Sequence, residues 1–246
     1  DYQWRNWIYK KYPIHMFAVS QFTKEVLMKF GAKESNIVVT YNGVNLTKFD
    51  KNKTTPVKIR TEFCIPKENV VIGHVGAMST NTKGQHILIE AFSRLCSKYS
   101  NISLIVVGDG SSLVDFKNLA IRLNVQDRVI FPGRRFDIPD FQSAFDIFCL
   151  TSIWGEMFPN AILEAMAMGN PWIGSDISGL SELTAGGAAG KVIEPGNIAA
   201  LERELDLLIS NKEERTKRGR EAYQEVVSKF TIQKVVDRIE CIYQTK

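Results

Sequence analysis

The sequence of 246 residues contains few of the residues that build disulfide frameworks and metal centres. It has 4 cysteines and 3 histidines, with no CxxC pair and no histidine at ligand spacing from a cysteine. This pattern argues against a disulfide framework and a metal site, and favours a reducing, cytosolic setting. We expect Cys96 and Cys149, which lie in apolar stretches, to pack as small hydrophobic side chains.

Long apolar runs and blocks of one charge are also lacking. No apolar run approaches the ~20 residues that span a bilayer. The net charge is only +4, and no Lys/Arg block is long or interleaved with aromatic residues, so nucleic acid is not expected as a partner. A mildly basic surface is compatible with peripheral contact with anionic lipid. We therefore expect a cytoplasmic protein. The chain begins at Asp1, with neither an initiator Met nor a signal peptide, which is typical of a fragment or a processed product.

Continuous apolar runs alternate with amphipathic stretches along most of the chain. This alternation predicts an α/β fold with a Rossmann-like, doubly wound parallel sheet, in which ligands bind at the carboxyl ends of the strands. Residues 44–68 are polar and read as irregular. The expected strands are 15–20, 37–41, 70–75, 102–107, 128–131, 145–150, 171–174 and 191–193, and the expected helices are 23–30, 85–99, 111–123, 160–168, 197–210, 213–229 and 232–245.

The loop after the strand at 70–75 is a candidate phosphate site. It runs from Gly76 to Gly84 and carries Lys83 just before a helix. A glycine permits close backbone approach, and a helix N-terminus offers free N–H groups to an anion. It is not a Walker A loop, because Gln85 follows the second glycine. A solvated loop lysine is an equally good interpretation of Lys83.

Two further glycine-containing loops carry weaker signals. Gly108-Asp109-Gly110 lacks the third glycine of a dinucleotide fingerprint, since position 113 is Leu, so it reads as a tight turn bordering the cleft. Gly133-Arg134-Arg135 follows another strand, and its arginines could face a phosphate or a base, or equally solvent. The broken fingerprint makes a nicotinamide dehydrogenase the least favoured function.

The segment from Thr151 to Gly169 carries the strongest signal. Pro159 suits the first turn of a helix, which places Glu156 in the loop before the helix and Glu164 inside it. The helix is otherwise apolar, so an acid within it is costly unless a group donates hydrogen bonds to it. Paired ribose hydroxyls would do so. A buried arginine partner, or a tilt towards solvent, would also explain Glu164.

Taken in order, these blocks resemble family 4 glycosyltransferases of the GT-B fold. The blocks are VGxM…KG, EAF, VVGDG, FPG, EMFPNAILEAMAMGNPWI, SDxSGLSE and GKVIEPGN. The resemblance runs from about residue 15 to the C-terminus. It implies the C-terminal, donor-binding half of a GT-B enzyme, whose reaction retains the anomeric configuration. It also implies no cofactor and no metal, and the absence of an Asp-x-Asp motif agrees with this.

The resemblance also implies roles for individual residues. Glu164 should accept the ribose hydroxyls of the donor, and Glu156 should contact the hydroxyls of its sugar. Lys83 should neutralise the diphosphate as it leaves. The remaining contacts should come from Gly76, from the backbone N–H groups of Met157 and Phe158 to the sugar-diphosphate, and from Gly133, Arg134 and Arg135 bordering the base.

Two features of this chain depart from the family pattern. Ala77 stands where the family usually has an arginine, so one diphosphate cation is missing; either Arg134 or Arg135 replaces it, or phosphate binding rests on Lys83 and the backbone. The acceptor domain is nearly absent. We expect residues 1–45 to be its end and the interdomain crossing, 46–228 the nucleotide-sugar domain, and 229–246 a helix returning towards the missing domain. Such a chain should bind donor without transferring sugar by itself.

The favoured function is the donor part of a hexosyltransferase that uses a UDP- or GDP-sugar and builds a glycan, glycolipid or capsule-like polymer. Its partners would be the nucleotide-sugar and, through the missing domain, the acceptor. A partner-dependent or non-catalytic nucleotide-sugar-binding subunit is the alternative, mildly favoured by Ala77. A sugar-nucleotide epimerase or a phosphorylase is a third possibility, although an epimerase would need more acids and histidines in the cleft.

Overall fold

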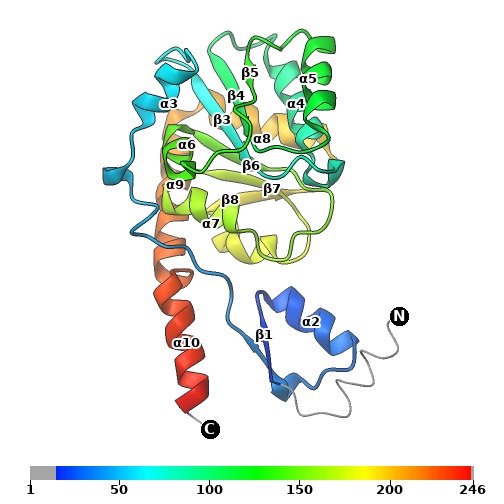
Figure 1. Ribbon diagram of the computed structural model, residues 1–246, viewed down its shortest axis with the longest axis vertical. Helices are drawn as coiled ribbons and strands as arrows, with labels where there is room; N and C mark the ends of the chain where they lie inside the picture. Colours follow the sequence, from blue (N-terminus) through cyan, green and yellow to red (C-terminus); the bar gives the residue numbers. More distant parts are fainter. Residues whose placement is uncertain (1–14, 245–246) are drawn as a thin grey trace.

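The computed structural model describes residues 15–244, and its main feature is a six-stranded, all-parallel sheet (Figure 1). The strand order β5-β4-β3-β6-β7-β8 reverses direction at β3, so the sheet is doubly wound, as predicted. The strands are β3 (Val70–Val75), β4 (Ile102–Val107), β5 (Val129–Ile130), β6 (Ile147–Leu150), β7 (Trp172–Ser175) and β8 (Gly190–Ile193).

Helices cover both faces of this sheet, which explains why its central strands are apolar throughout. Along β6, Phe148 packs into the core on one face while Ile147 and Cys149 pack into the core on the other. One face is covered by α4 (Gln85–Leu95), α5 (Leu113–Arg122) and α8 (Ile198–Ser210). The other is covered by α3 (Pro56–Glu62), α6 (Ile138–Ala144), α7 (Asn160–Ala167) and α9 (Lys212–Lys229).

The sequence interpretation of residues 44–68 as irregular was wrong, because α3 lies within them. This helix begins at Pro56 and buries Ile59 completely. The helix α6 was missed for the same reasons, and it also has a proline in its first turn. A helix of two turns shows no clear periodicity, and a proline there starts the helix instead of breaking it.

A smaller unit lies apart from the main sheet. Here β1 (Met16–Ala18) and β2 (Ile37–Val39) form a two-stranded parallel sheet, with α2 (Gln21–Lys29) between them. The last helix, α10 (Ile232–Gln244), leaves the main domain and runs towards this unit (Figure 1). The rings of Phe17 and Tyr243 lie 6.4 Å apart, and Arg238 donates a hydrogen bond to the Thr40 carbonyl. Where the domain boundaries fall stays a prediction.

Short 3₁₀ turns complete the described chain. They lie at Glu34–Asn36, Lys51–Lys53, Asn81–Lys83, Leu180–Leu183 and Ala185–Gly187. Between residues 15 and 244, none of the helices has the combination of length and apolar character needed to cross a membrane.

Glu182 joins the smaller unit to the main domain by capping α2. Its carboxylate accepts hydrogen bonds from the backbone N–H groups of Gln21, at 2.9 Å, and Phe22, at 3.2 Å. These groups lie in the first turn of the helix, where they have no partner within the helix. A negative charge there also interacts favourably with the helix dipole.

Replacing Glu182 by alanine should therefore loosen α2 locally. We expect a loss of about 1 kcal/mol in the protection of its first turn, the usual effect of removing a cap. Amide hydrogen exchange at Gln21 and Phe22 measures it. Glu68→Ala is the matched control, because Glu68 is exposed on the main domain. Unchanged exchange at both amides in Glu182→Ala would contradict the capping role.

Candidate functional site

The loops that follow β3, β4 and β5 are joined to one another at the carboxyl edge of the sheet. The Gly76 N–H donates to the Val107 carbonyl, and the Gly108 N–H donates to the Gly133 carbonyl, both at 3.0 Å. Gly108 has a φ of +142°, and a Cβ there would lie 1.9 Å from the Gly76 carbonyl oxygen. The prediction of a tight turn at this position is confirmed, and glycine is needed because the two backbones touch.

The loop after β6 is held against the loop that carries Lys83. The Thr151 hydroxyl donates to the Gly84 carbonyl at 2.8 Å, and the Ile153 N–H donates to the Thr82 carbonyl at 2.7 Å. Gly84 has a φ of +66°, and a Cβ there would lie 1.9 Å from the Thr151 carbonyl oxygen. The close approach of these two loops brings Lys83 next to the segment that contains Glu156.

Lys83 and Glu156 form an ion pair in this structure. The Lys83 ammonium donates to Glu156 Oε1, and the Ser152 hydroxyl donates to the same oxygen at 2.8 Å. Glu156 is only 7% exposed. The two residues were expected to contact different parts of a donor, and in this structure they contact each other directly. Ser152, which is fully buried, was not predicted; its only signal was its position at the carboxyl end of a strand.

A cavity of about 230 Å³ opens beside this ion pair. Its wall includes Gly76 and Ala77 from one loop and Pro159, Asn160 and Ala161 from the start of α7, together with Val75, Lys83, Leu150 and Glu156. The cavity therefore joins a cation, a carboxylate and the N-terminus of a helix. This combination can hold a group with both negative charge and hydroxyls.

Met157 and Phe158 lie between Glu156 and the start of α7, but neither residue lines the cavity. Within residues 15–244, neither N–H group has a hydrogen-bond partner. The Phe158 side chain is buried, with its ring 5.2 Å from that of Tyr41 and 5.4 Å from that of Phe230. The Asn42 side-chain amide donates to the Phe158 carbonyl at 2.7 Å. The Phe158 side chain and carbonyl therefore hold the loop before α7 in place. The N–H groups of Met157 and Phe158 are not used in these contacts.

Glu164 lies on α7 and does not line this cavity. Ile162, Leu163, Ala165, Met166 and Ala167 around it are buried, as the sequence predicted. Burial raises the pKa of its carboxyl group to about 7, against the opposing charge of Lys48. No hydrogen bond or ion pair from the described part of the chain reaches the Glu164 side chain. Glu164 is therefore a buried acid, as predicted, and the described part of the chain supplies no hydrogen-bond donor to its carboxyl group.

The two arginines after Gly133 have different surroundings. Arg135 is held by the carboxylates of Glu62 and Asp137, with its guanidinium 5.0 Å from the ring centre of Phe141. Arg134 is exposed, and its guanidinium lies 5.4 Å from the ring centre of Phe136. Arg135 is thus already paired, and neither arginine lines the cavity that contains Gly76 and Ala77.

His74 lies on β3, one residue before the cavity wall begins at Val75, and no role was predicted for it. Its Nδ1–H donates to the Cys149 carbonyl at 3.0 Å, whereas Nε2 is buried without a partner. Burial lowers the pKa of His74 to about 4, so the ring is neutral at pH 7. A Cβ at Gly76 would lie 3.0 Å from Nε2. A side chain at position 76 would therefore require the imidazole to shift by a few tenths of an ångström.

Between residues 15 and 244, no group of three or more His, Cys, Asp or Glu side chains is placed to hold a metal ion. That the reaction needs no metal stays a prediction.

Known proteins share both the sequence pattern and the fold. The family described as Glycosyl transferases group 1 matches residues 58–225. N-acetyl-alpha-D-glucosaminyl L-malate synthase of Bacillus anthracis is 26% identical over 85% of this chain and 53% of its own length. A glycosyltransferase structure from Rickettsia africae has a TM-score of 0.90 at 28% identity, over 99% of this chain and 66% of that one.

A ligand-bound structure is also similar. Anabaena HepE in complex with UDP has a TM-score of 0.87 at 26% identity, over 94% of this chain and 64% of that one, and HepE has also been solved with UDP-glucose. This chain spans about half the length of the Bacillus anthracis synthase. Since the family match covers more than half of the chain, the chain belongs to the group 1 glycosyl transferases.

Proposed function

We propose that this chain supplies the donor-binding part of a retaining glycosyltransferase of family 4. The enzyme would move a hexosyl group from a nucleotide-sugar to a glycan or glycolipid acceptor. The observation that carries the proposal is the Lys83–Glu156 pair in the wall of a cavity at the carboxyl edge of the sheet. Similarity to HepE, which was solved with UDP and with UDP-glucose, favours a UDP-sugar over a GDP-sugar.

The ion pair suggests how the donor is received. When a diphosphate occupies the cavity, the Lys83 ammonium exchanges its carboxylate partner for phosphate oxygens. Glu156 is then free to accept hydrogen bonds from hydroxyls of the sugar, while Ser152 keeps its carboxylate in place. The free N–H groups of Met157 and Phe158 add donors to the diphosphate.

These groups act on the bond that breaks. The bond between the anomeric carbon and the diphosphate oxygen is cleaved, and the acceptor hydroxyl forms the new bond on the same face of the sugar. The departing diphosphate gains negative charge, and it takes the proton that the acceptor hydroxyl loses. Lys83 and the backbone N–H groups stabilise this developing charge, which is the contribution that a metal makes in other transferases.

Binding of UDP-glucose tests the proposal. We expect UDP-glucose to raise the melting temperature of the chain, because a ligand that binds only the folded state stabilises it. Lys83→Ala and Glu164→Ala should each reduce this shift. Matched controls are Lys67→Ala, at an exposed lysine, and Glu90→Ala, at a partly buried glutamate on α4 away from the cavity. If neither Lys83→Ala nor Glu164→Ala changes the affinity, the donor site is assigned wrongly.

A further inference from the structure

A second cavity lies at the opposite edge of the sheet from Glu156. It has a volume of about 730 Å³, within the range of small-molecule sites. Asp146, directly before β6, and Asn170, two residues before β7, contribute to its wall, so it opens at the amino ends of these strands. Helix α9 and the segment around Lys51 form the remaining sides.

Lys51 brings an ammonium group to this cavity without a counter-ion. Within residues 15–244, this ammonium has neither a hydrogen bond nor an ion pair. It lies against the turn between α7 and β7, where a Cβ on Gly169 would be only 3.1 Å from Nζ. The absence of a side chain at Gly169 makes room for the charge. Desolvation lowers the pKa of Lys51, while the charge of Asp146 in the same cavity acts in the opposite direction.

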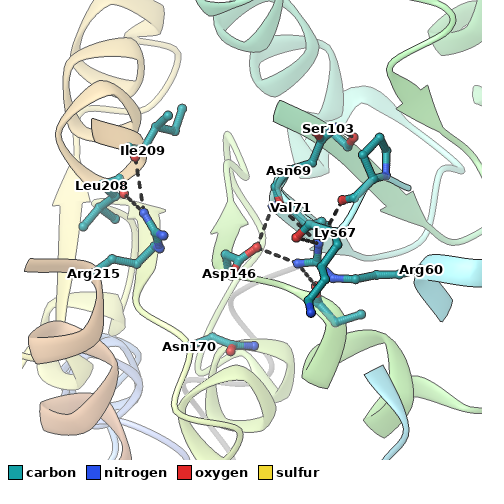
Figure 2. A network of polar contacts seen from close by, with 12 residues as sticks. Arg60, Lys67, Asn69, Val71, Ser103, Asp146, Asn170, Leu208, Ile209 and Arg215 are labelled. Carbon is teal, nitrogen blue, oxygen red and sulfur yellow. Dashed lines mark hydrogen bonds and ion pairs between the residues drawn. The ribbon is translucent and has the colours of Figure 1, made fainter. Parts of the chain in front are cut away.

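Two arginines of α9 also line the cavity. Arg215 Nη1 donates to the carbonyls of Leu208, at 2.6 Å, and Ile209, at 3.3 Å, at the end of α8. These bonds fix its guanidinium, and Nε and Nη2 have no protein partner in the described part of the chain. Figure 2 shows this guanidinium to the left of Asp146, on the side away from Arg60, with Asn170 lower in the view. Arg220 is exposed, with one carboxylate, that of Glu221, at 4.0 Å.

The carboxylates of the cavity already have partners. Asp146 Oδ2 accepts from Arg60 Nη2 and from the Val71 N–H, both at 2.8 Å (Figure 2). Asp50 accepts from the Asn52 N–H at 3.0 Å and lies 3.6 Å from the Lys53 ammonium. Neither carboxylate lies within 4 Å of the ammonium of Lys51 or the guanidinium of Arg215. The cavity therefore offers unpaired positive charge, although it contains acids.

The remaining wall is partly apolar. Phe49, Phe145 and Pro171 are buried around it, and Tyr223 is exposed at its edge. The Asn170 side-chain amide donates to the Gln142 carbonyl at 2.6 Å, so it is held in place. A ligand that fits this cavity would have two parts. One is an anionic group that accepts several hydrogen bonds, and the other is a small organic group that packs against the apolar wall.

We propose that this cavity binds a small organic phosphate through Lys51, Arg215 and Arg220. A phosphate monoester matches three cationic side chains from two separate segments better than a single carboxylate does, since it presents three charged oxygens. The ester could be a free metabolite or the headgroup of a lipid, and the two share this chemistry. The proposal does not depend on the donor site or on the proposed function.

Titration with glycerol 3-phosphate, with glycerol as the uncharged counterpart, tests the proposal. We expect saturable binding of glycerol 3-phosphate with a dissociation constant of about 1 mM or below, and none of glycerol. In ¹⁵N-labelled chain, the amide signals of Gly169 and Gly219 should shift, because both residues line the cavity. Shifts confined to Gly76 and its neighbours would place the ligand in the donor site and overturn the proposal.

Charge-removing variants make the test specific. Lys51→Met and Arg220→Met should each weaken binding about tenfold, the effect of losing one charge-assisted hydrogen bond. Lys53→Met is the matched control, because Lys53 belongs to the same 3₁₀ turn but does not line the cavity, and Lys83→Met is the control for the donor site. Equal weakening by Lys53→Met and Lys51→Met, or no saturable binding, would overturn the proposal.

Vesicles separate the two sources of the phosphate. Phosphatidylcholine vesicles with and without phosphatidic acid are compared for binding to the chain and to Lys51→Met. Binding that requires both phosphatidic acid and Lys51 supports a lipid headgroup. Saturable binding of glycerol 3-phosphate without such vesicle binding supports a free metabolite.

Discussion

Replacing Lys83 by methionine should destabilise the folded chain by about 3 kcal/mol, because it leaves a buried carboxylate without its cation. The Glu156 side chain is 9% exposed, so water cannot replace the lost partner fully. The Ser152 hydroxyl remains as a donor but carries no charge. Methionine keeps most of the apolar stem of the lysine, so the loss reports mainly on the charge.

Removing the carboxylate of the pair should lower the free energy of unfolding by less than removing the ammonium does. Glu156→Gln leaves the Lys83 ammonium without its carboxylate, but the Lys83 side chain is 28% exposed and can turn towards water. The glutamine oxygen can still accept the bond from Ser152. We therefore expect a loss of about 1 kcal/mol, the size of an ordinary hydrogen bond.

Urea unfolding of the two single variants and the double variant measures both effects. The double variant should lose less stability than the two single losses added together. The reason is that it leaves neither an unpaired carboxylate nor an unpaired ammonium at this position. Equal losses in the two single variants, with an additive double variant, would show that the ion pair is not buried in solution. Lys67→Met, at an exposed lysine, is the control for loss of a lysine charge.

The main sheet could be predicted because its strands are buried on both faces. The expected boundaries of β3 and β4, residues 70–75 and 102–107, agree with the structure. Continuous apolar runs between glycine-rich turns are typical of such strands. The short helices α3 and α6 could not be predicted in this way, because each packs through a few residues whose partners are distant in sequence.

Contacts between residues far apart in the sequence could not be predicted from the sequence. Lys83 and Glu156 are separated by 73 positions, and Glu182 caps α2 from 161 positions away. A buried acid in an apolar helix, in contrast, is a local pattern. For this reason Glu164 was predicted to need hydrogen-bond donors, while the pairing of Lys83 with Glu156 was not.

Replacing Glu164 by glutamine should stabilise the chain at pH 8 and leave it nearly unchanged at pH 4. Burial raises the pKa of Glu164 from 4.5 to about 7 in the folded state. A folded-state pKa above the unfolded one means that the folded chain holds the proton more tightly. Its contribution to stability is present below pH 4.5 and is lost as the pH rises through about 7.

The amide does not ionise, so Glu164→Gln avoids this loss. The gain at pH 8 should be about 2 kcal/mol, somewhat less than the full pKa shift implies, because the side chain keeps some contact with solvent. Thermal unfolding without ligand, at pH 4, 6 and 8, measures it. Glu90→Gln on α4 is the matched control for replacing a glutamate by glutamine. A gain that is equal at all three pH values would contradict the raised pKa.

The same group should make donor binding depend on pH if Glu164 accepts the ribose hydroxyls. A carboxylate accepts two donors at once, whereas the protonated acid must use one oxygen as a donor. At pH 6 only about a tenth of a group with a pKa of about 7 is ionised, so UDP-glucose should bind up to about tenfold more weakly than at pH 8. The diphosphate diester of UDP-glucose does not titrate between pH 6 and pH 8. In Glu164→Gln the affinity should be low and should not change between these pH values. A parallel change with pH in the variant would assign the titration to another group.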